Sequence, residues 1–372
     1  MAQPFDVCIR GAGVVGRTLA LLLARDGLRV ALLAEPSAAG APGVDVRAYA
    51  LNGAARGLLE SLRSWPDDAF ATAVLGMQVC GDDGGEVNFS AAIQGAPALA
   101  WIVDVPALEA RLIDAVRYQP LVEVVDTPQS AALIVVCEGR GSRARTEFGV
   151  DFDVTPYAQQ AIAARLRCEK PHAQIAHQWF ADNEILAFLP LGGEQGNSVA
   201  VVWSVPQEQV AHLLALEPEE FARQLGAASH DALGTLTLDS ERVAWPLQLA
   251  RANRWVGQHA GQSWALAGDA AHTVHPLAGQ GLNLGLADAA ELARVLHERE
   301  YWRSVGDPRL LRRYERARKA DVLSMGLATD GLQQLFARET GPWQALRNWG
   351  MNGFEHSGPL KTWLARRAMG LR

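Results

Sequence analysis

A glycine-rich turn near the start of the chain has the spacing of a phosphate-binding loop. Its glycines, Gly11, Gly13 and Gly16, follow the pattern G-x-G-x-x-G. Such a loop lets the backbone approach a pyrophosphate and directs the amides of the next helix toward its charge. The pattern alone is weak, because an ordinary tight turn can use the same residues. Here an apolar strand-like run precedes the loop and helical apolar spacing follows it, which favours dinucleotide binding.

Two further residues near this loop bear on the same interpretation. A second strand-like run at residues 29–33 follows the helix expected over residues 14–25, and Glu35 closes it. An acid about twenty residues beyond the loop binds a ribose hydroxyl in dinucleotide-binding units. Arg10 is unusual at the end of a strand, and its charge can face either solvent or the phosphates. The whole opening predicts strand, helix and strand in a parallel sheet.

A second segment that could carry chemistry covers residues 266–283. An apolar strand ends on Asp269, and a loop poor in side chains follows. Gly279 and Gly281 would let the backbone approach a flat ring. The helix expected to start near Leu282 has an amide dipole that can stabilise negative charge. Asp269 could accept hydrogen bonds from a sugar-alcohol chain, whereas the alternative is a generic glycine-rich turn between a strand and a helix.

Composition limits the class of protein. The chain has 372 residues, of which 49% are hydrophobic and 20% charged, a globular balance with enough length for two lobes. Its net charge of -7 disfavours nonspecific binding of nucleic acid. The four cysteines, Cys8, Cys80, Cys137 and Cys168, form no C-x-x-C pair, so zinc and dithiol chemistry lack support. We expect buried free thiols in a reducing cytosol.

The sequence predicts a cytoplasmic protein. Arg10, Arg17 and Arg25 interrupt the apolar start, unlike the unbroken core of a signal peptide. No apolar run is long enough to span a bilayer. Residues 355–372 carry basic and apolar side chains that partly fit one helical face, so this segment packs either on the protein or on anionic lipid at the inner face of the membrane.

The segment from Gly268 to Asp288, GDAAHTVHPLAGQGLNLGLAD, is far more specific than a glycine pattern. It resembles the second FAD motif of group A flavoprotein monooxygenases, which share the para-hydroxybenzoate hydroxylase fold, and its spelling is closest to the ubiquinone-biosynthesis hydroxylases. The resemblance covers most of the chain. Besides this segment it includes residues 47–51, 185–191, 201–204, 330–332 and 346–348.

The resemblance extends to residues 137–145, which are similar to the Asp-Gly motif that serves both FAD and NAD(P)H in the family. Glu138 replaces the usual aspartate and carries its charge farther out. Val105 falls where several relatives have a polar contact with the flavin. The residues expected at the FAD are Gly11, Gly13, Gly16, Glu35, Arg47, Glu138, Gly139, Arg145, Asp269, Pro276, Gly279, Gln280, Gly281, Leu282 and Asn283.

The family resemblance also implies an activity. It implies an FAD-dependent monooxygenase that uses NAD(P)H and O2 to form a C4a-hydroperoxyflavin, which hydroxylates a phenolic ring. The substrate implied by the ubiquinone branch is a phenol with a prenyl tail, which partitions into a membrane or is delivered within a biosynthetic complex. His275 is our candidate for proton handling, and the alternative is a loop histidine bonded to the backbone. No metal is expected.

The expected fold class is α/β: a Rossmann-type FAD-binding lobe with an inserted antiparallel β-sheet substrate lobe and a helical C-terminus. A hairpin signal at residues 81–85 and strand-like runs at residues 174–180, 185–189 and 198–205 indicate the inserted sheet. The expected FAD-binding domain comprises residues 1–70, 98–160 and 255–325, the substrate domain residues 71–97 and 161–254, and the C-terminal helical segment residues 326–372.

Three alternatives to a hydroxylase stay open. One is another flavin oxidoreductase of the same fold, such as a prenyl-chain reductase or a halogenase; the halogenase is disfavoured because no W-x-W-x-I-P segment is present. A second is a flavin-binding scaffold subunit of a quinone-biosynthesis complex with reduced catalysis, which the unusual Glu138 and Val105 keep open. The third, an NAD-dependent dehydrogenase, leaves the segment at residues 268–283 unexplained.

Overall fold

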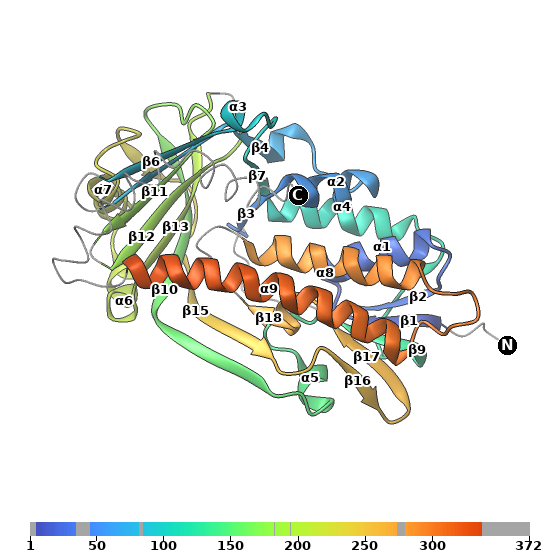
Figure 1. Cartoon of the computed structure of the whole chain (residues 1–372). Coiled ribbons are helices and arrows are strands. Elements are labelled where there is room, and N and C mark those ends of the chain that lie inside the picture. Colours follow the sequence, from blue (N-terminus) through green and yellow to red (C-terminus); the bar gives the residue numbers. More distant parts are fainter. Residues whose placement is uncertain are drawn as a thin grey trace.

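The chain folds around one mostly parallel sheet and one mostly antiparallel sheet (Figure 1). This computed structural model describes residues 5–34, 45–81, 85–181, 183–193, 195–273 and 280–336, with only the backbone for residues 280 and 324–336. Four residues expected at the site, Glu35, His275, Pro276 and Gly279, lie outside this range, as does the expected C-terminal helix at residues 355–372.

The parallel sheet contains six strands in the order β16-β17-β9-β1-β2-β8. All neighbours are parallel except β16, which forms a hairpin with β17. The strands are β1 (Phe5–Arg10), β2 (Val30–Leu33), β8 (Val122–Val125), β9 (Ala131–Val136), β16 (Val256–His259) and β17 (Gln262–Leu266). The expected opening of strand, helix and strand is therefore confirmed, with the two strands paired in parallel.

Both faces of this sheet are buried, as a parallel sheet requires. On one face, Val7 and Ile9 pack in one large core that includes residues of four longer helices. On the other face, Val136 and Leu266 pack with Phe148, which follows a short helix. The four helices are α1 (Val14–Arg25), α4 (Val105–Arg117), α8 (Gln280–His297) and α9 (Pro308–Phe336), and the short helix is α5 (Arg143–Glu147). The expected α/β class is confirmed by this layering.

The second sheet has nine strands, with β14 paired to β10 beside the path β18-β15-β10-β13-β12-β11-β5-β6. Its pairs are antiparallel except β11 with β5. The strands are β5 (Gly76–Cys80), β6 (Glu86–Ser90), β10 (Phe152–Cys168), β11 (Ile175–Ala181), β12 (Glu184–Pro190), β13 (Ser198–Pro206), β14 (Leu236–Leu238), β15 (Val243–Ala252) and β18 (His272–Thr273). The hairpin expected around residues 81–85 joins β5 and β6.

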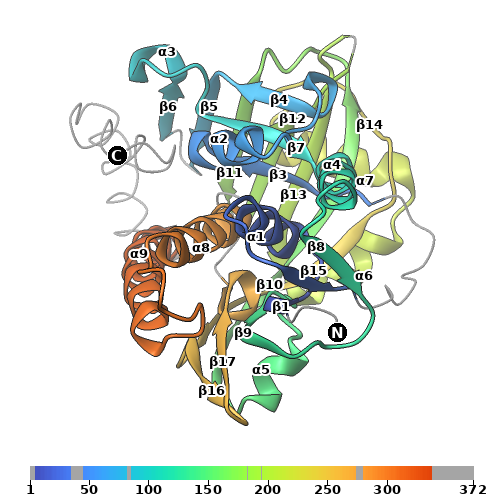
Figure 2. The ribbon, with the colours of Figure 1, turned by 90° about the vertical axis from the view of Figure 1, so that its right-hand side faces the viewer.

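One face of the nine-stranded sheet has helices of its own. Ile162, Leu186 and Trp203 pack there with Phe221 and Leu225 of the second of two helices. These helices are α6 (Gln207–Ala215) and α7 (Pro218–Ala228). Figure 2 shows this sheet and its helices beside the layers of the six-stranded sheet. The other face of the nine-stranded sheet is therefore the one left to meet the rest of the molecule.

A small third sheet lies at the junction. Its strands β3 (Ala48–Leu51), β7 (Ala100–Asp104) and β4 (Ala71–Val74) are antiparallel in the order β3-β7-β4. Two short helices flank it, α2 (Gly53–Ser61) and α3 (Ala91–Gln94). The long strand β10 runs across the domain boundary expected at residue 160, and its pairing with β15 shifts register between Pro156 and Gln160.

Within the described part of the chain, no helix is long and apolar enough to cross a membrane.

Candidate active site

The glycine loop has two closely packed positions and one open position. A Cβ on Gly11 would lie 2.4 Å from the carbonyl oxygen of Cys137, and one on Gly16 would lie 2.0 Å from that of Gly11. Gly11 also has φ +110°, which other residues rarely adopt. A Cβ on Gly13 would meet no atom of the described residues within 4 Å. Gly11 and Gly16 thus serve packing, whereas Gly13 borders free space.

That free space lies at the N-terminus of α1. Gly13 is the N-cap of this helix and, being glycine, has no side chain that could cap the first amides. The first amides of a helix lack partners within the helix and attract anions. A pyrophosphate fits this position because the helix start is open and no cap side chain competes for its amides.

The second glycine-rich segment brings Asp269 to the same end of the sheet. Asp269 lies in the 3-10 turn η2 (Gly268–Ala270), which directly follows β17. Burial raises the pKa of the Asp269 carboxyl above its usual value, and the charges of His272 and Arg140 only partly oppose this. Among the described residues we find no hydrogen-bond donor to this carboxylate. A hydroxyl-bearing ligand would therefore lower the cost of its burial.

A cluster of three buried residues, here called the buried acid cluster, holds the Asp269 turn. Asp288 of α8 accepts hydrogen bonds from the Gly268 amide at 2.9 Å and from His272 Nε2 at 2.7 Å. Its other oxygen accepts one from Arg318 Nε at 2.7 Å. Burial by itself would raise the pKa of Asp288, but His272 and Arg318 outweigh it, and the pKa is lowered. The cluster fixes the turn to α8 and α9.

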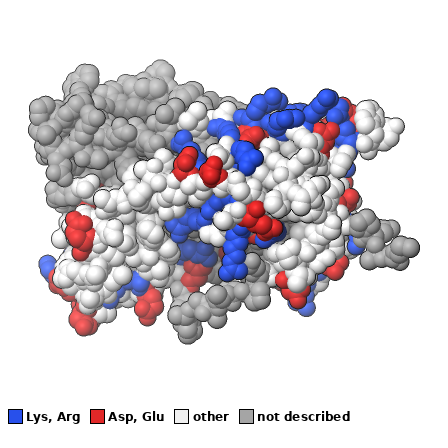
Figure 3. Space-filling model, turned by 90° about the horizontal axis from the view of Figure 1, so that it is seen from below, with Lys and Arg blue, Asp and Glu red and all other residues white. Residues whose placement is uncertain are grey.

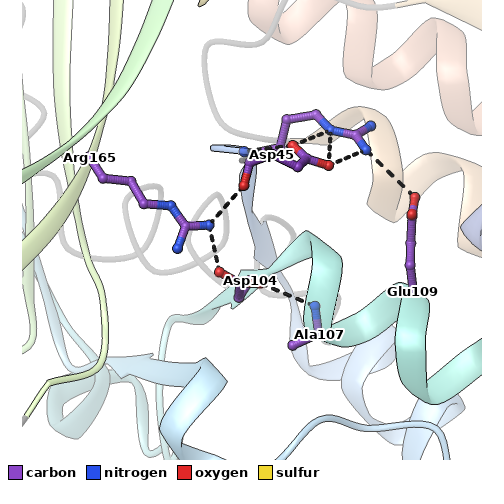
Figure 4. A network of polar contacts seen from close by, with 6 residues as sticks. Asp45, Asp104, Ala107, Glu109 and Arg165 are labelled. Atoms are coloured by element: carbon purple, nitrogen blue, oxygen red, sulfur yellow. Dashed lines mark hydrogen bonds and ion pairs between the residues drawn. The ribbon is translucent and has the colours of Figure 1, made fainter. Parts of the chain in front are cut away.

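A second group of charges, here called the interlobe network, joins the nine-stranded sheet to the small sheet and α4 (Figure 4). Arg47 pairs with Asp45 at 2.6 Å and lies 3.6 Å from Glu109. Arg165 of β10 donates to Asp104 Oδ2 at 2.5 Å and lies 3.4 Å from the Asp45 carbonyl oxygen. Asp104 is also the N-cap of α4 and accepts the Ala107 amide at 3.1 Å. Arg47, expected at the FAD, is therefore already paired with carboxylates.

Tyr49 of β3 connects this network to the Asp269 turn. Burial raises the pKa of Tyr49, while the charge of Arg47 lowers it and that of Asp269 raises it. Both charges are therefore close enough to act on the phenol. The pKa of Tyr49 therefore depends on its burial and on the charges of both Arg47 and Asp269.

Glu138, expected among the residues at the FAD, binds protein groups in this structure. Its carboxylate accepts hydrogen bonds from Ser142 Oγ at 2.8 Å, from the Ala144 amide at 2.9 Å and from Arg10 Nε at 3.0 Å. Arg10 also pairs with Glu147 at 2.8 Å. Of the two alternatives for Arg10, an exposed side chain is not what the structure has, because the side chain is 11% exposed and faces these two acids.

Two other expected cofactor residues hold the backbone of the site. Arg145 donates to the Ala270 carbonyl oxygen at 3.1 Å and to that of Arg140 at 2.7 Å. Asn283 accepts the Asn52 amide at 2.9 Å and donates to the Ala50 carbonyl oxygen at 2.8 Å. Arg145 thereby fixes the Asp269 turn to α5, and Asn283 fixes α8 to β3.

The remaining expected residues are placed as follows. Gly139 has φ +76°, and a Cβ there would meet nothing within 4 Å. Helix α8 begins at Gln280, two residues before the expected start at Leu282. Its first three residues are Gln280, Gly281 and Leu282. The Val105 side chain is buried at the start of α4 and offers no polar contact.

Sequence reasoning missed three residues of this region. Tyr49 lies inside the quoted motif at residues 47–51 and could have been chosen as its one aromatic residue. Asp288 closes the second FAD motif, where its acidic side chain on an apolar helix was a signal. Arg318 lies on a helix with many exposed arginines, so nothing in the sequence distinguishes it.

The comparisons with known proteins agree with this geometry. Residues 118–325, more than half of the chain, match the FAD binding domain family. The ubiquinone hydroxylase UbiL of Rhodospirillum rubrum is 32% identical, over 98% of this chain and 89% of its own. The 3-demethoxyubiquinol 3-hydroxylase of Escherichia coli is 29% identical over 99% of both chains.

A solved structure shows the same fold. The p-nitrophenol 4-monooxygenase PnpA of Pseudomonas putida aligns with a TM-score of 0.74 at 18% identity, over 99% of this chain and 97% of its own. The family match and the full-length relatives agree with the motif resemblance and with the open loop at Gly13. The chain therefore belongs to the ubiquinone-biosynthesis hydroxylase family of FAD-dependent aromatic monooxygenases.

Proposed function

We propose that this enzyme hydroxylates the phenolic ring of a prenylated ubiquinone precursor, using NAD(P)H and O2. The names of its full-length relatives, a ubiquinone hydroxylase and a 3-demethoxyubiquinol 3-hydroxylase, support this substrate class. When bound, FAD supplies the electron and oxygen-transfer chemistry. The chain's own residues bind the cofactor, position the ring and exclude water. The observation that carries the cofactor assignment is the open space at Gly13 in front of the uncapped helix α1.

We assign the described cofactor contacts to two groups. Gly13, with the first amides of α1, would face the pyrophosphate. A side chain at this position would contact none of the described residues near its Cβ and would instead occupy the space proposed for the ligand. Asp269 would accept hydrogen bonds from the hydroxyls of the sugar-alcohol chain. Glu138, Arg145 and Asn283 would act as positioning residues, since their polar atoms already bind protein groups.

The substrate ring would lie against the face of the nine-stranded sheet that turns toward the FAD-binding strands. Neighbouring strands place Ala163, Val202 and Ala187 side by side on this face. Arg165, on the same face, donates to Asp104 at the start of α4, and this contact supports the proposed orientation of the face. Small apolar side chains suit an apolar aromatic ligand.

Two buried polar residues on that face are candidates to orient the substrate hydroxyl. Gln178 lies next to Ala187, and Ser204 lies next to Ala161 and Ile185. Both side chains are buried. This assignment agrees with the proposed division of the chain, in which residues 71–97 and 161–254 form the substrate domain and residues 1–70, 98–160 and 255–325 bind FAD.

The proposal is tested by following the oxygen atom. Purified enzyme with FAD, NADH or NADPH, a short-chain phenolic quinone precursor and isotopically labelled dioxygen should yield a product that carries one labelled oxygen. Val202→Phe should retain FAD but lower product formation, whereas Ile162→Val, on the opposite face, is the matched control. FAD binding and NAD(P)H oxidation that release only hydrogen peroxide, with every substrate of this class, would instead support a scaffold role.

We also propose that the enzyme works at the membrane surface or within a biosynthetic complex. A prenylated substrate partitions into the bilayer, so its ring has to be presented to the enzyme at the bilayer surface or handed over by a partner. Which surface of the chain would face the bilayer is a separate question.

A further inference from the structure

An exposed aromatic pair lies at the connection between α8 and α9. Tyr301 is 92% exposed and Trp302 67% exposed, and their rings meet edge to face with centroids 4.9 Å apart. Among the described residues, Trp302 is the one tryptophan with such exposure. Trp302 is one of the residues that line an open surface hollow of about 620 Å³. Tryptophan and tyrosine with free ring surface are typical of the interface between water and lipid.

A stripe of arginines begins next to this pair. Arg309, Arg312, Arg313 and Arg316 of α9 are all exposed, and their spacing places them on one face of the helix. The opposite face packs inward through Leu311, Tyr314 and Arg318. We call the four exposed residues the basic stripe. Figure 3 shows Lys and Arg side chains gathered over the first half of α9.

Few acids oppose the basic stripe. Residues 308–320 contain five arginines, one lysine and a single glutamate, in a chain with a net charge of -7. That glutamate, Glu315, turns inward and accepts the amide of Trp255 at 2.9 Å. Arg313 lies 3.4 Å from Glu298, whereas the side chains of Arg312 and Arg316 form no ion pair within the described residues. Arg312 and Arg316 therefore present positive charge that no carboxylate of the described residues compensates.

We propose that the α8–α9 connection and the basic stripe dock on an anionic phospholipid bilayer. Charge complementarity requires a negative partner, and the adjacent aromatic pair favours lipid over an acidic protein, because rings with free surface enter the headgroup region. Basic residues near an anionic leaflet add to binding individually. The docking surface is inferred without reference to the reaction. It rests on the proposed function only for the reason to dock, which is access to a prenylated substrate.

The surface is tested by vesicle co-sedimentation of the full chain with FAD bound. Vesicles of phosphatidylcholine alone are compared with vesicles that also contain phosphatidylglycerol. We expect binding to the anionic vesicles only, and weaker binding as salt is added. Arg312→Glu combined with Arg316→Glu should weaken binding about 30-fold or more, and Trp302→Ser should weaken it about tenfold.

Matched controls lie at the end of α4, on another part of the surface. Arg117 and Tyr118 form an exposed pair of the same kinds of residue, with the guanidinium 6.0 Å from the ring centroid. Arg117→Glu and Tyr118→Ser should bind vesicles like the wild type. Binding that ignores lipid charge, that is lost equally in the controls, or that is replaced by capture of an acidic protein would overturn the proposal. Turnover of a short-chain water-soluble substrate, measured on the same variants, reports separately on the proposed function.

Discussion

The buried acid cluster and the interlobe network both flank the candidate site, but they differ in burial and in what they join. Asp288 and Arg318 are 0% and 4% exposed, and their cluster fixes one turn to two helices of the same lobe. Arg47 and Asp45 are 38% and 31% exposed, and their network joins strands of different sheets. A charge in the core has only its protein partners to stabilise it, so losing one of them is costly. Where a charged side chain is partly exposed, water can replace a lost partner.

The comparison indicates a division of labour. The turn that carries Asp269 is held rigidly, because losing a member of the buried acid cluster removes a charged hydrogen bond from a group in the core. The junction between the lobes is held by contacts that water can replace at small cost. We therefore infer a fixed cofactor side and an adjustable substrate side.

The largest effect is expected for Asp288→Asn. Removing this charge takes away the buried acid that pairs with Arg318 and leaves its guanidinium paired only with the exposed Asp321, so the free energy of unfolding should fall by about 3–5 kcal/mol. Denaturant unfolding measures it, with Glu291→Gln, an acid of the same helix paired at the surface with Arg294, as the control. Because the pKa of Asp288 is lowered in the folded state, its stabilisation is present at neutral pH and lost as the pH falls below about 4. Equal stability of the two variants would remove the distinction between the regions.

A smaller effect, on affinity rather than on folding, is expected for Asp269→Ala. Loss of a charged hydrogen-bond acceptor costs roughly 1.5–3 kcal/mol, so FAD should bind roughly ten- to a hundredfold more weakly. Fluorescence titration of apo-protein measures this. Unchanged FAD affinity would exclude Asp269 from the site.

The affinity for FAD should also depend on pH through Asp269. Burial raises the pKa of this carboxyl, and only its ionised form accepts hydrogen bonds from hydroxyls at both oxygens. FAD binding should therefore weaken as the pH falls through that raised pKa, by up to about tenfold per pH unit. Asp269→Asn should flatten the profile in the same pH range, and a slope that persists in this variant would point to another group.

The smallest effect is expected for the interlobe network. Arg165→Met removes the pair with Asp104, whose side chains are 24% and 14% exposed, and should lower stability by only about 1 kcal/mol. A double-mutant cycle with Asp104→Asn isolates the pair, and added salt should reduce its coupling. A loss as large as that of Asp288→Asn would show that the junction is as rigid as the core.

The sequence predicts the parts of this site that are built from neighbouring residues. The glycine loop, helix α1 and the Asp269 turn are local, so spacing and the family motif were sufficient. The pairs of Arg10 with Glu138 and of Asp288 with Arg318 join residues far apart in the chain, and only the fold brings them together. Arg145 was expected at the cofactor but binds the carbonyl oxygen of Ala270, because a buried guanidinium takes whatever acceptors the fold presents.

The central claim, that the open position of the glycine loop receives the cofactor, is tested most directly by FAD titration of Gly13→Val. The backbone of Gly13, with φ -77°, suits any residue, and the added atoms would meet no protein atom near the Cβ. Gly57→Val, also at a position open around its Cβ, is the control. We predict that both variants fold with nearly wild-type stability and that only Gly13→Val loses FAD binding. A Gly13→Val protein that purifies with a full complement of FAD would contradict the account.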